Sequence, residues 1–261
     1  MKDYQGFKNN GNWYKGNLHS HTTISDGKMT PEQSVEVYKE HGYNFLALSE
    51  HDIYTDYRKQ YNTDNFIMIP AILYQEEGSS KRLEIHHLHG ILGTSEMQKN
   101  AKAPLFTHME HVPPQKHYGT WRGREISQEI ADMLRDRGCV VTYNHPIWSR
   151  VTEEEFIYTE GVQALEIFNY NTVLESNTGY DVTYWDRMLR MGKKINGFAS
   201  DDNHNEGLFE DSCGGWICVQ APELTHDAII QNFLDGNYYS SAGPVIKDWG
   251  IKDGKAWISC S

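Results

Sequence analysis

Histidine and carboxylate residues form short clusters along this 261-residue chain, which contains 13 histidines. Imidazole and carboxylate ligands without thiolates suit divalent ions of borderline or harder character, such as Zn, Mn or Fe. A single histidine usually packs or faces solvent, but this many clusters together indicate a metal site. The clusters are His19-Ser-His21 with Asp26, Glu50-His51-Asp52, His86-His87-Leu-His89, Asn144-His145, and Asp201-Asp202-Asn-His204.

The number of ligands favours two or three divalent metal ions rather than one. In an extended strand His19 and His21 point to the same side, so one ion can contact both. Asp202 and His204 repeat this spacing. Ions about 3.5–4 Å apart can hold the attacking and leaving oxygens of a displacement at phosphorus and can deprotonate a bound water. The pattern therefore indicates hydrolysis by a metal-activated hydroxide.

The elements that must position these groups are short apolar strands that alternate with helical patterns. This alternation is typical of βα units around a mostly parallel sheet. In α/β barrels the C-terminal ends of the strands converge on the face that carries the active site. We expect strands at 13–18, 45–49, 66–73, 85–92, 139–143, 164–168, 195–199 and 216–219 and after 238, helices from 31 and at 127–137, 181–191 and 225–234, and an irregular active-site loop at 95–120.

The first helix has the clearest local signals. Thr30 is suited to the N-cap, Pro31 to the first helical position, and Gln33 to the return bond of a capping box. Gly42 supplies a C-terminal stop.

No repeat, low-complexity tract or long linker divides the chain, so we expect a single domain over residues 1–261 with a β-rich trim at about 215–261. The net charge of −12 disfavours nonspecific nucleic-acid binding, and we expect no nucleic-acid duplex as a partner. No apolar run reaches the roughly 18 residues of a membrane span, and the first residues lack a hydrophobic signal segment. We therefore expect a cytoplasmic protein with no membrane partner.

The order of the motifs resembles the PHP (polymerase and histidinol phosphatase) family over most of the chain. The run HSHT-x-x-SDG, a following TP-x-x helix and LSEHD resemble the opening block of that family. The resemblance implies a distorted (βα)7 barrel, a di- or trinuclear metal site at the C-terminal ends of the strands, and hydrolysis of phosphate esters. Carried over motif by motif, it implies the metal ligands His19, His21, Asp26, His51, His87, His145, Asp202 and His204.

One ligand of the family has no direct counterpart here. The family usually places a bridging Glu after a strand that reads roughly I-P-G-x-E, whereas this chain reads Ile69-Pro70-Ala71-Ile72-Leu73. We choose Glu76 as the substitute ligand, with Glu77 as the alternative. If neither reaches the metals, the centre loses an ion or its catalytic competence.

The sequence thus predicts a metal-dependent phosphoesterase, with a small phosphorylated molecule or nucleotide as substrate. His204, His51 and Asp202 are the expected catalytic residues, and His204 is a candidate acid for protonating the leaving alkoxide. Arg150, Lys116 and Ser241 are the expected substrate contacts, because they lie in predicted loops or turns.

Two alternatives stay open. A metal-dependent amide or ester hydrolase is possible in principle, because the same hydroxide attacks carbonyl carbon, and a cleft without protein cations would favour it. A non-catalytic metal-binding module is the other, and Leu73 at the family's Glu position is the feature that supports it.

Overall fold

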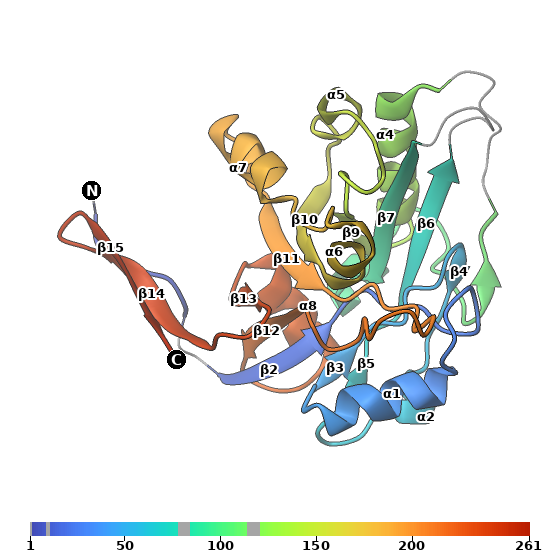
Figure 1. The fold of residues 1–261 in the computed structure, drawn as a ribbon, viewed down its shortest axis with the longest axis horizontal. Coiled ribbons are helices and arrows are strands. Elements are labelled where there is room, and N and C mark those ends of the chain that lie inside the picture. Colours follow the sequence, from blue (N-terminus) through green and yellow to red (C-terminus); the bar gives the residue numbers. More distant parts are fainter. Residues whose placement is uncertain (1, 9–10, 78–83, 114–120) are drawn as a thin grey trace.

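The computed structural model describes residues 2–8, 11–77, 84–113 and 121–261, and two five-stranded sheets form its centre (Figure 1). Their strand orders are β11-β10-β9-β7-β6 and β13-β12-β2-β3-β5. The strands are β2 (Asn12–Asn17), β3 (Phe45–Leu46), β5 (Ile67–Met68), β6 (Ala71–Glu77), β7 (Ile85–Leu92), β9 (Cys139–Tyr143), β10 (Val162–Asn169), β11 (Asn196–Ser200), β12 (Trp216–Ala221) and β13 (Tyr238–Ser241).

The strand directions are mixed, so the expectation of a mostly parallel sheet holds only in part. β2, β3 and β5 pair in parallel, as do β9, β10 and β11. However, β7 runs antiparallel to both β6 and β9, and β12 runs antiparallel to β2 and β13. Only residues 78–84 separate β6 from β7. A parallel crossover needs a dozen or more residues, so this short connection imposes a reversal.

Two isolated bridges join the sheets at the ends that carry the histidine clusters. Ser20 pairs with Asn203, and His51 pairs with Leu73, both in parallel. The backbone N–H of Asp202 donates to the carbonyl of His19 at 2.9 Å beside the first bridge. Within the described residues the strand pairings do not form one closed barrel. The fold is mixed α/β, and the distorted (βα)7 barrel implied by the resemblance stays a prediction.

Helices cover the sheets, and α1 begins as its sequence predicts. Thr30 Oγ1 accepts from the backbone N–H of Gln33 at 3.3 Å, and Gln33 Oε1 accepts from the backbone N–H of Thr30 at 2.9 Å. The helices are α1 (Pro31–Glu40), α2 (Arg58–Tyr61), α3 (Ser95–Lys99), α4 (Gly123–Asp136), α5 (Glu153–Phe156), α6 (Tyr170–Ser176), α7 (Val182–Arg190) and α8 (His226–Leu234).

The segment 95–120, predicted to be irregular, contains regular structure in its described part. Thr94 caps α3 by accepting from the backbone N–H of Met97 at 3.3 Å. Further along, β8 (Glu110–His111) pairs antiparallel with β4 (Ile53–Tyr54). This pairing is long-range, and the local sequence carries no signal for it.

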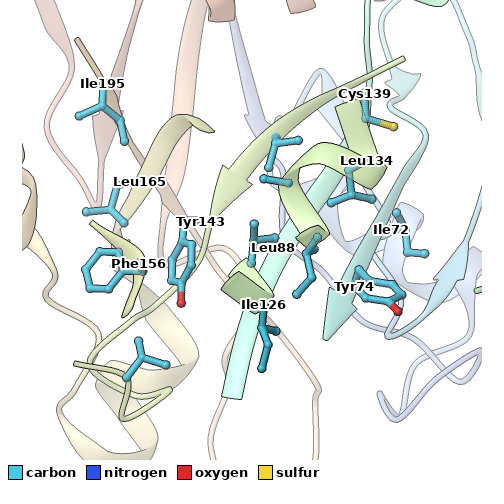
Figure 2. Packing of buried hydrophobic residues seen from close by; sticks show 14 of the residues in the cluster. Ile72, Tyr74, Leu88, Ile126, Leu134, Cys139, Tyr143, Phe156, Leu165 and Ile195 are labelled. Carbon is cyan, nitrogen blue, oxygen red and sulfur yellow. The ribbon is translucent and has the colours of Figure 1, made fainter. Parts of the chain in front are cut away.

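The largest apolar cluster packs α4 against one face of β6, β7 and β9 (Figure 2). Leu134 of α4 lies over Gly90 of β7, where a Cβ atom would be only 2.7 Å from Leu134 Cδ2. Glycine at this position therefore lets the helix lie close to the sheet. Because side chains alternate along a strand, the opposite face of the same three strands points to the space between the sheets.

That space is apolar at one end and polar at the other. Its apolar cluster draws residues from both sheets, including Leu18, Ala71, Ile91, Val140 and Phe198. The buried histidines and carboxylates of the predicted clusters continue from this core toward the bridged ends of the strands.

A third sheet of β1 (Tyr4–Gln5), β14 (Ile246–Lys252) and β15 (Lys255–Cys260) projects from the body near both termini (Figure 1). It forms part of the β-rich region expected at the C-terminus. In the described part of the chain no helix has the length and apolar character needed to cross a membrane.

We predict that Leu134→Ala lowers the free energy of unfolding by about 2–5 kcal/mol, because Leu134 is fully buried between α4 and β7. Urea denaturation followed by circular dichroism measures the change. Leu189→Ala is the control, because Leu189 is 42% exposed on α7, and it should change stability by no more than about 1 kcal/mol. Equal effects of the two substitutions would contradict the packing described for α4.

Candidate metal centre

Four side chains place donor atoms around one point near the ends of the strands. These residues are His21, Asp26, His51 and His204, and one donor atom from each lies within 4.8 Å of all the others. Asp26 Oδ2 is 3.5 Å from His51 Nε2, and Asp26 Oδ1 is 3.6 Å from His204 Nε2. Donors about 2.1 Å from a tetrahedral ion lie about 3.4 Å from one another. The spacing of this first group is therefore compatible with a shared metal ion.

A second group lies directly beside the first and contains His19, His145 and Asp202. Asp202 Oδ1 is 2.9 Å from His19 Nε2, and Asp202 Oδ2 is 3.7 Å from His145 Nε2. Asp202 Oδ1 is also 3.1 Å from Nε2 of His21, a member of the first group. The carboxylate of Asp202 thus lies between the two groups.

His87 reaches the second group from near the start of β7. Its Nδ1 atom is 3.2 Å from His145 Nε2, and its Nε2 atom is 3.1 Å from Gln75 Oε1. Because β7 is antiparallel to β6 and β9, its first residues lie beside their last residues, and His87 pairs with Gln75. Gln75 is a site residue that the sequence did not indicate.

Glu76 does not join either group. It lies on the face of β6 that carries Ile72, which packs against α4, whereas Leu73 and Gln75 lie on the opposite face. The physical reason is the two-residue period of a strand, since a shift of three positions from Leu73 turns the side chain to the other face. The choice of Glu76 as the substitute ligand therefore has no support in the geometry. The side chain of Glu77 lies outside the described part of the structure.

Glu166 of β10, which the sequence left outside the ligand set, is fully buried at the centre. Its Oε1 atom is 2.8 Å from His19 Nδ1 and also accepts a hydrogen bond from Ser200 Oγ. Its Oε2 atom accepts from the backbone N–H of His145 and from Asn169 Nδ2, both at 3.0 Å. Glu166 therefore orients the His19 ring so that Nε2 faces Asp202.

Glu50 organises the loop that carries Asp26. Its buried carboxylate accepts from the backbone N–H groups of Thr22 at 3.1 Å and Ser25 at 3.2 Å, and from both hydroxyls. Burial raises the pKa of Glu50, although these hydrogen bonds oppose the shift. These hydrogen bonds to Glu50 hold the loop in place, and the side chain of Asp26 stays half exposed beside the first group.

Asp201 and Asp202 are adjacent in the sequence but have different partners. The carboxylate of Asp201 accepts from Tyr38 Oη at 2.7 Å and from three successive backbone N–H groups at 213–215. Burial raises its pKa to about 6 against these bonds. Asp201 therefore anchors a turn, and Asp202 faces the donor groups.

Three residues at the centre have positive φ, namely Asp52 at 56°, His145 at 26° and Asp202 at 55°. Such backbone costs energy for residues other than glycine and persists where the surrounding contacts hold it. At Asp202 and His145 those contacts are the hydrogen bonds to His19 and Glu166.

The groups of the centre strongly shift one another's pKa values. Burial lowers the pKa of His19, but the carboxylates of Asp202 and Glu166 outweigh it and raise the pKa to about 10. Burial and the neighbouring imidazoles hold the pKa of His21 well below its usual range. For His51, burial outweighs the nearby carboxylates and lowers the pKa to about 4.

A cleft of about 610 Å³ opens onto both groups. His51, His87, His145 and His204 line its inner part, and Trp148, Leu208 and Phe209 contribute apolar surface. The described lining contains five carboxylate residues and no Lys or Arg.

Neither of the two predicted substrate contacts that the structure describes lies at this cleft. Arg150 is exposed and lies outside the lining. Ser241 Oγ donates to the carbonyl of Pro244 at 2.6 Å and accepts from the backbone N–H of Gly243 at 3.0 Å, so it stabilises its own turn. Lys116 lies outside the described residues.

Comparison with known proteins shows the fold. No family model matches the chain, and no curated protein matches it. A two-domain protein from Bacteroides vulgatus, described as containing a predicted PHP-like metal-dependent phosphoesterase, aligns with a TM-score of 0.54 and 15% identity. The chain has a PHP-like fold. The alignment covers 89% of this chain and 66% of that protein, which is just under two thirds of its length.

A second solved structure supports the PHP-like fold. An amidohydrolase from Chromobacterium violaceum, with bound sulfate and no metal, aligns with a TM-score of 0.51 and 12% identity over 86% of this chain and 97% of that chain. The family resemblance expected from the motifs is therefore confirmed at the level of the fold.

The expected exclusion of a nucleic-acid duplex was wrong. Endonuclease Q, solved with a 27-mer duplex substrate that has an abasic lesion at the active site, aligns with a TM-score of 0.49 and 14% identity, over 88% of this chain and 58% of that chain. Net charge was an insufficient ground for the exclusion, because bound cations can dominate the field at a local site.

We predict that Asp181→Asn removes a pH-dependent loss of stability. Asp181 is buried behind the His145 turn, where Oδ1 accepts from the backbone N–H of Ile147 at 3.0 Å and Oδ2 has no hydrogen-bond partner among the described residues. Burial raises the Asp181 pKa to about 8. Between roughly pH 4 and pH 8 the folded chain therefore holds a proton that the unfolded chain has released, so stability falls as pH rises, by up to about 1.4 kcal/mol per pH unit.

Urea denaturation of both proteins at pH 5, 6, 7 and 8 measures this effect. The difference in unfolding free energy, variant minus wild type, should grow with pH, because both proteins share every other titrating group. A constant difference across this range would contradict the assignment of the raised pKa to Asp181.

Proposed function

We propose that this protein is a metal-dependent hydrolase that cleaves phosphate esters of small molecules. The observation that carries the proposal is the pair of adjacent donor groups with Asp202 between them, at the inner end of the cleft. The PHP-like fold supports the same class of chemistry. A volume of about 610 Å³ is in the range of pockets for small molecules.

The side chains present fit divalent cations. His19 Nε2 and His21 Nε2 face each other at 3.1 Å. The Nδ1 atom of His21, which is 3.9 Å from Asp26 Oδ1, is buried without a hydrogen-bond partner in the described part of the structure. An unsatisfied buried polar atom costs about 1–3 kcal/mol, so a cation bound at this nitrogen would offset that penalty.

We assign one ion to His21, Asp26 and His51, and a second to His19, His145 and Asp202, with His87 beside the second. Three protein ligands per ion is the number typical of open catalytic zinc sites. Zn, Mn and Fe all suit imidazole and carboxylate donors. When bound, such ions would supply charge stabilisation at a phosphoryl group and activation of a water molecule.

His204 is the residue that we propose for proton delivery. Its Nδ1 atom donates to the carbonyl of Asp202 at 2.9 Å, so Nε2 faces Asp26 in the cleft. Burial lowers its pKa, but in the metal-free protein Asp26 and Asp202 outweigh this effect and raise the pKa to about 9. Cations bound to these carboxylates would weaken their effect on the pKa. A protonated imidazole in this place can donate to a leaving alkoxide.

Hydrolysis of an amide or ester is the second candidate. The observation that favours it is the lack of Lys and Arg in the described lining of the cleft. Phosphoryl oxygens would then meet no protein cation other than imidazole, whereas a carbonyl substrate needs none.

We predict that the protein loaded with Mn, Zn or Fe(II) releases phosphate from small phosphomonoesters, and that His21→Ala abolishes the release. Loss of a direct ligand should cost more than the 10–100-fold that loss of an outer partner costs in metal affinity or activity. Phosphate assay and metal analysis by mass spectrometry are run on the same samples. His41→Ala is the control, because His41 is exposed and its ring Nδ1 donates to the carbonyl of Val37 in the preceding helix at 2.8 Å.

The outcomes separate the candidates. Cleavage of amides or esters without phosphate release would favour the second function. Full metal loading with no turnover of either substrate class would contradict both and favour a binding module.

We further predict that Glu166→Gln weakens binding of the second ion by about 10–100-fold, because Gln cannot accept all four hydrogen bonds made by this carboxylate. Metal titration of the metal-free protein in competition with a chelator should show that one ion binds more weakly and that the affinity for the other is unchanged. The exposed Glu154→Gln is the control. Equal weakening of both ions, or of neither, would be inconsistent with contacts that involve the second group alone.

A further inference from the structure

The exposed part of the cleft lining, called the outer wall below, carries two carboxylates that the proposed reaction does not use. Glu175 lies on α6, and Glu206 lies in the loop that follows β11. Both are exposed, and in the described part of the structure neither forms an ion pair with Lys or Arg. Glu175 Oε2 accepts from Trp148 Nε1 at 2.7 Å, which fixes this carboxylate beside the indole ring.

The other carboxylates of the lining are already engaged. Asp26 and Asp202 belong to the donor groups, where bound cations would neutralise them. Asp211 is buried and accepts from the backbone N–H groups of His204 at 2.7 Å and Asn205 at 3.1 Å. Glu175 and Glu206 are therefore the uncompensated charges that a substrate would meet outside the centre.

Apolar side chains line the same cleft. They are Trp148, Phe209 and Leu208, and Leu208 is 82% exposed. A large apolar side chain so exposed at the mouth of a cleft gains buried surface when a ligand covers it. The outer cleft thus offers apolar contact together with negative charge.

We propose that Glu175 and Glu206 determine specificity by the charge of the leaving group. The inner donor groups take the phosphoryl group, and the outer wall takes the rest of the ester. Like charges repel across this wall, so a leaving group with its own carboxylate is disfavoured, and a neutral or cationic ring is accepted against Trp148. This inference rests on the proposed phosphoesterase function and adds the class of its leaving group.

Three phosphomonoesters with the same ring test the proposal, namely phenyl phosphate, 4-carboxyphenyl phosphate and 4-(aminomethyl)phenyl phosphate. The metal-loaded wild type should hydrolyse the aminomethyl ester with a kcat/KM at least about tenfold above that of the carboxy ester. In the double variant Glu175→Gln, Glu206→Gln this ratio should fall toward one, while phenyl phosphate changes by less than about twofold. High salt should lower the ratio in the wild type, because exposed charges are screened.

The matched control is Glu210→Gln, an exposed glutamate in the same loop that does not line the cleft, and its ratio should equal that of the wild type. Metal content and urea denaturation verify that the double variant is folded and loaded. Hydrolysis of all three esters with a ratio that is unchanged in the double variant would overturn this inference alone. Hydrolysis of none of them by the loaded wild type would overturn the proposed function.

Discussion

The buried carboxylate of Glu166 ties together the ends of four strands. Its two oxygens accept hydrogen bonds from four groups. These are the His19 ring after β2, the backbone N–H of His145 after β9, the side-chain amide of Asn169 at the end of β10, and the Ser200 hydroxyl at the end of β11. A buried charge costs several kcal/mol unless such bonds are complete. The strand ends must therefore be aligned before this carboxylate is satisfied. Assembly of the sheets and assembly of the donor groups are thus one event.

The centre also contains features that oppose stability. His145 and Asp202 have positive φ, and the Nδ1 atoms of His21 and His51 are buried without partners among the described residues. A ligand that binds only the folded state raises its stability by mass action. A cation that satisfied the His21 Nδ1 atom would therefore stabilise the fold while it completed the site. Function and stability would then depend on the same few atoms.

Features that depend on residues close together in the sequence are predicted best. The capping box of Thr30 and Gln33 and the bounds of β7 and β9 match their predictions because these signals are local. The reversal of β7 was missed, since strand direction depends on pairing across the sheet.

Glu76 was chosen by its distance along the chain, but the phase of the strand turns it away. Glu166 was left outside the ligand set, because only the fold shows its partners. Arg150 and Ser241 were chosen because they lie in predicted loops or turns, and the path of a loop is not encoded by residue type.

The charge of the described cleft sets a condition on any phosphoester substrate. No Lys or Arg in the described lining can balance the phosphoryl charge, so the donor groups and their cations would have to balance it alone. Substrate binding would then depend on occupancy of the centre, and the apoprotein would repel the substrates that the loaded protein attracts. The overall charge of −12 is uninformative about this field. Two divalent ions held by Asp26 and Asp202 would invert its sign at the inner end, while Glu175 and Glu206 would keep the outer end negative. A cleft with opposite fields at its two ends would orient an ester before any hydrogen bond formed.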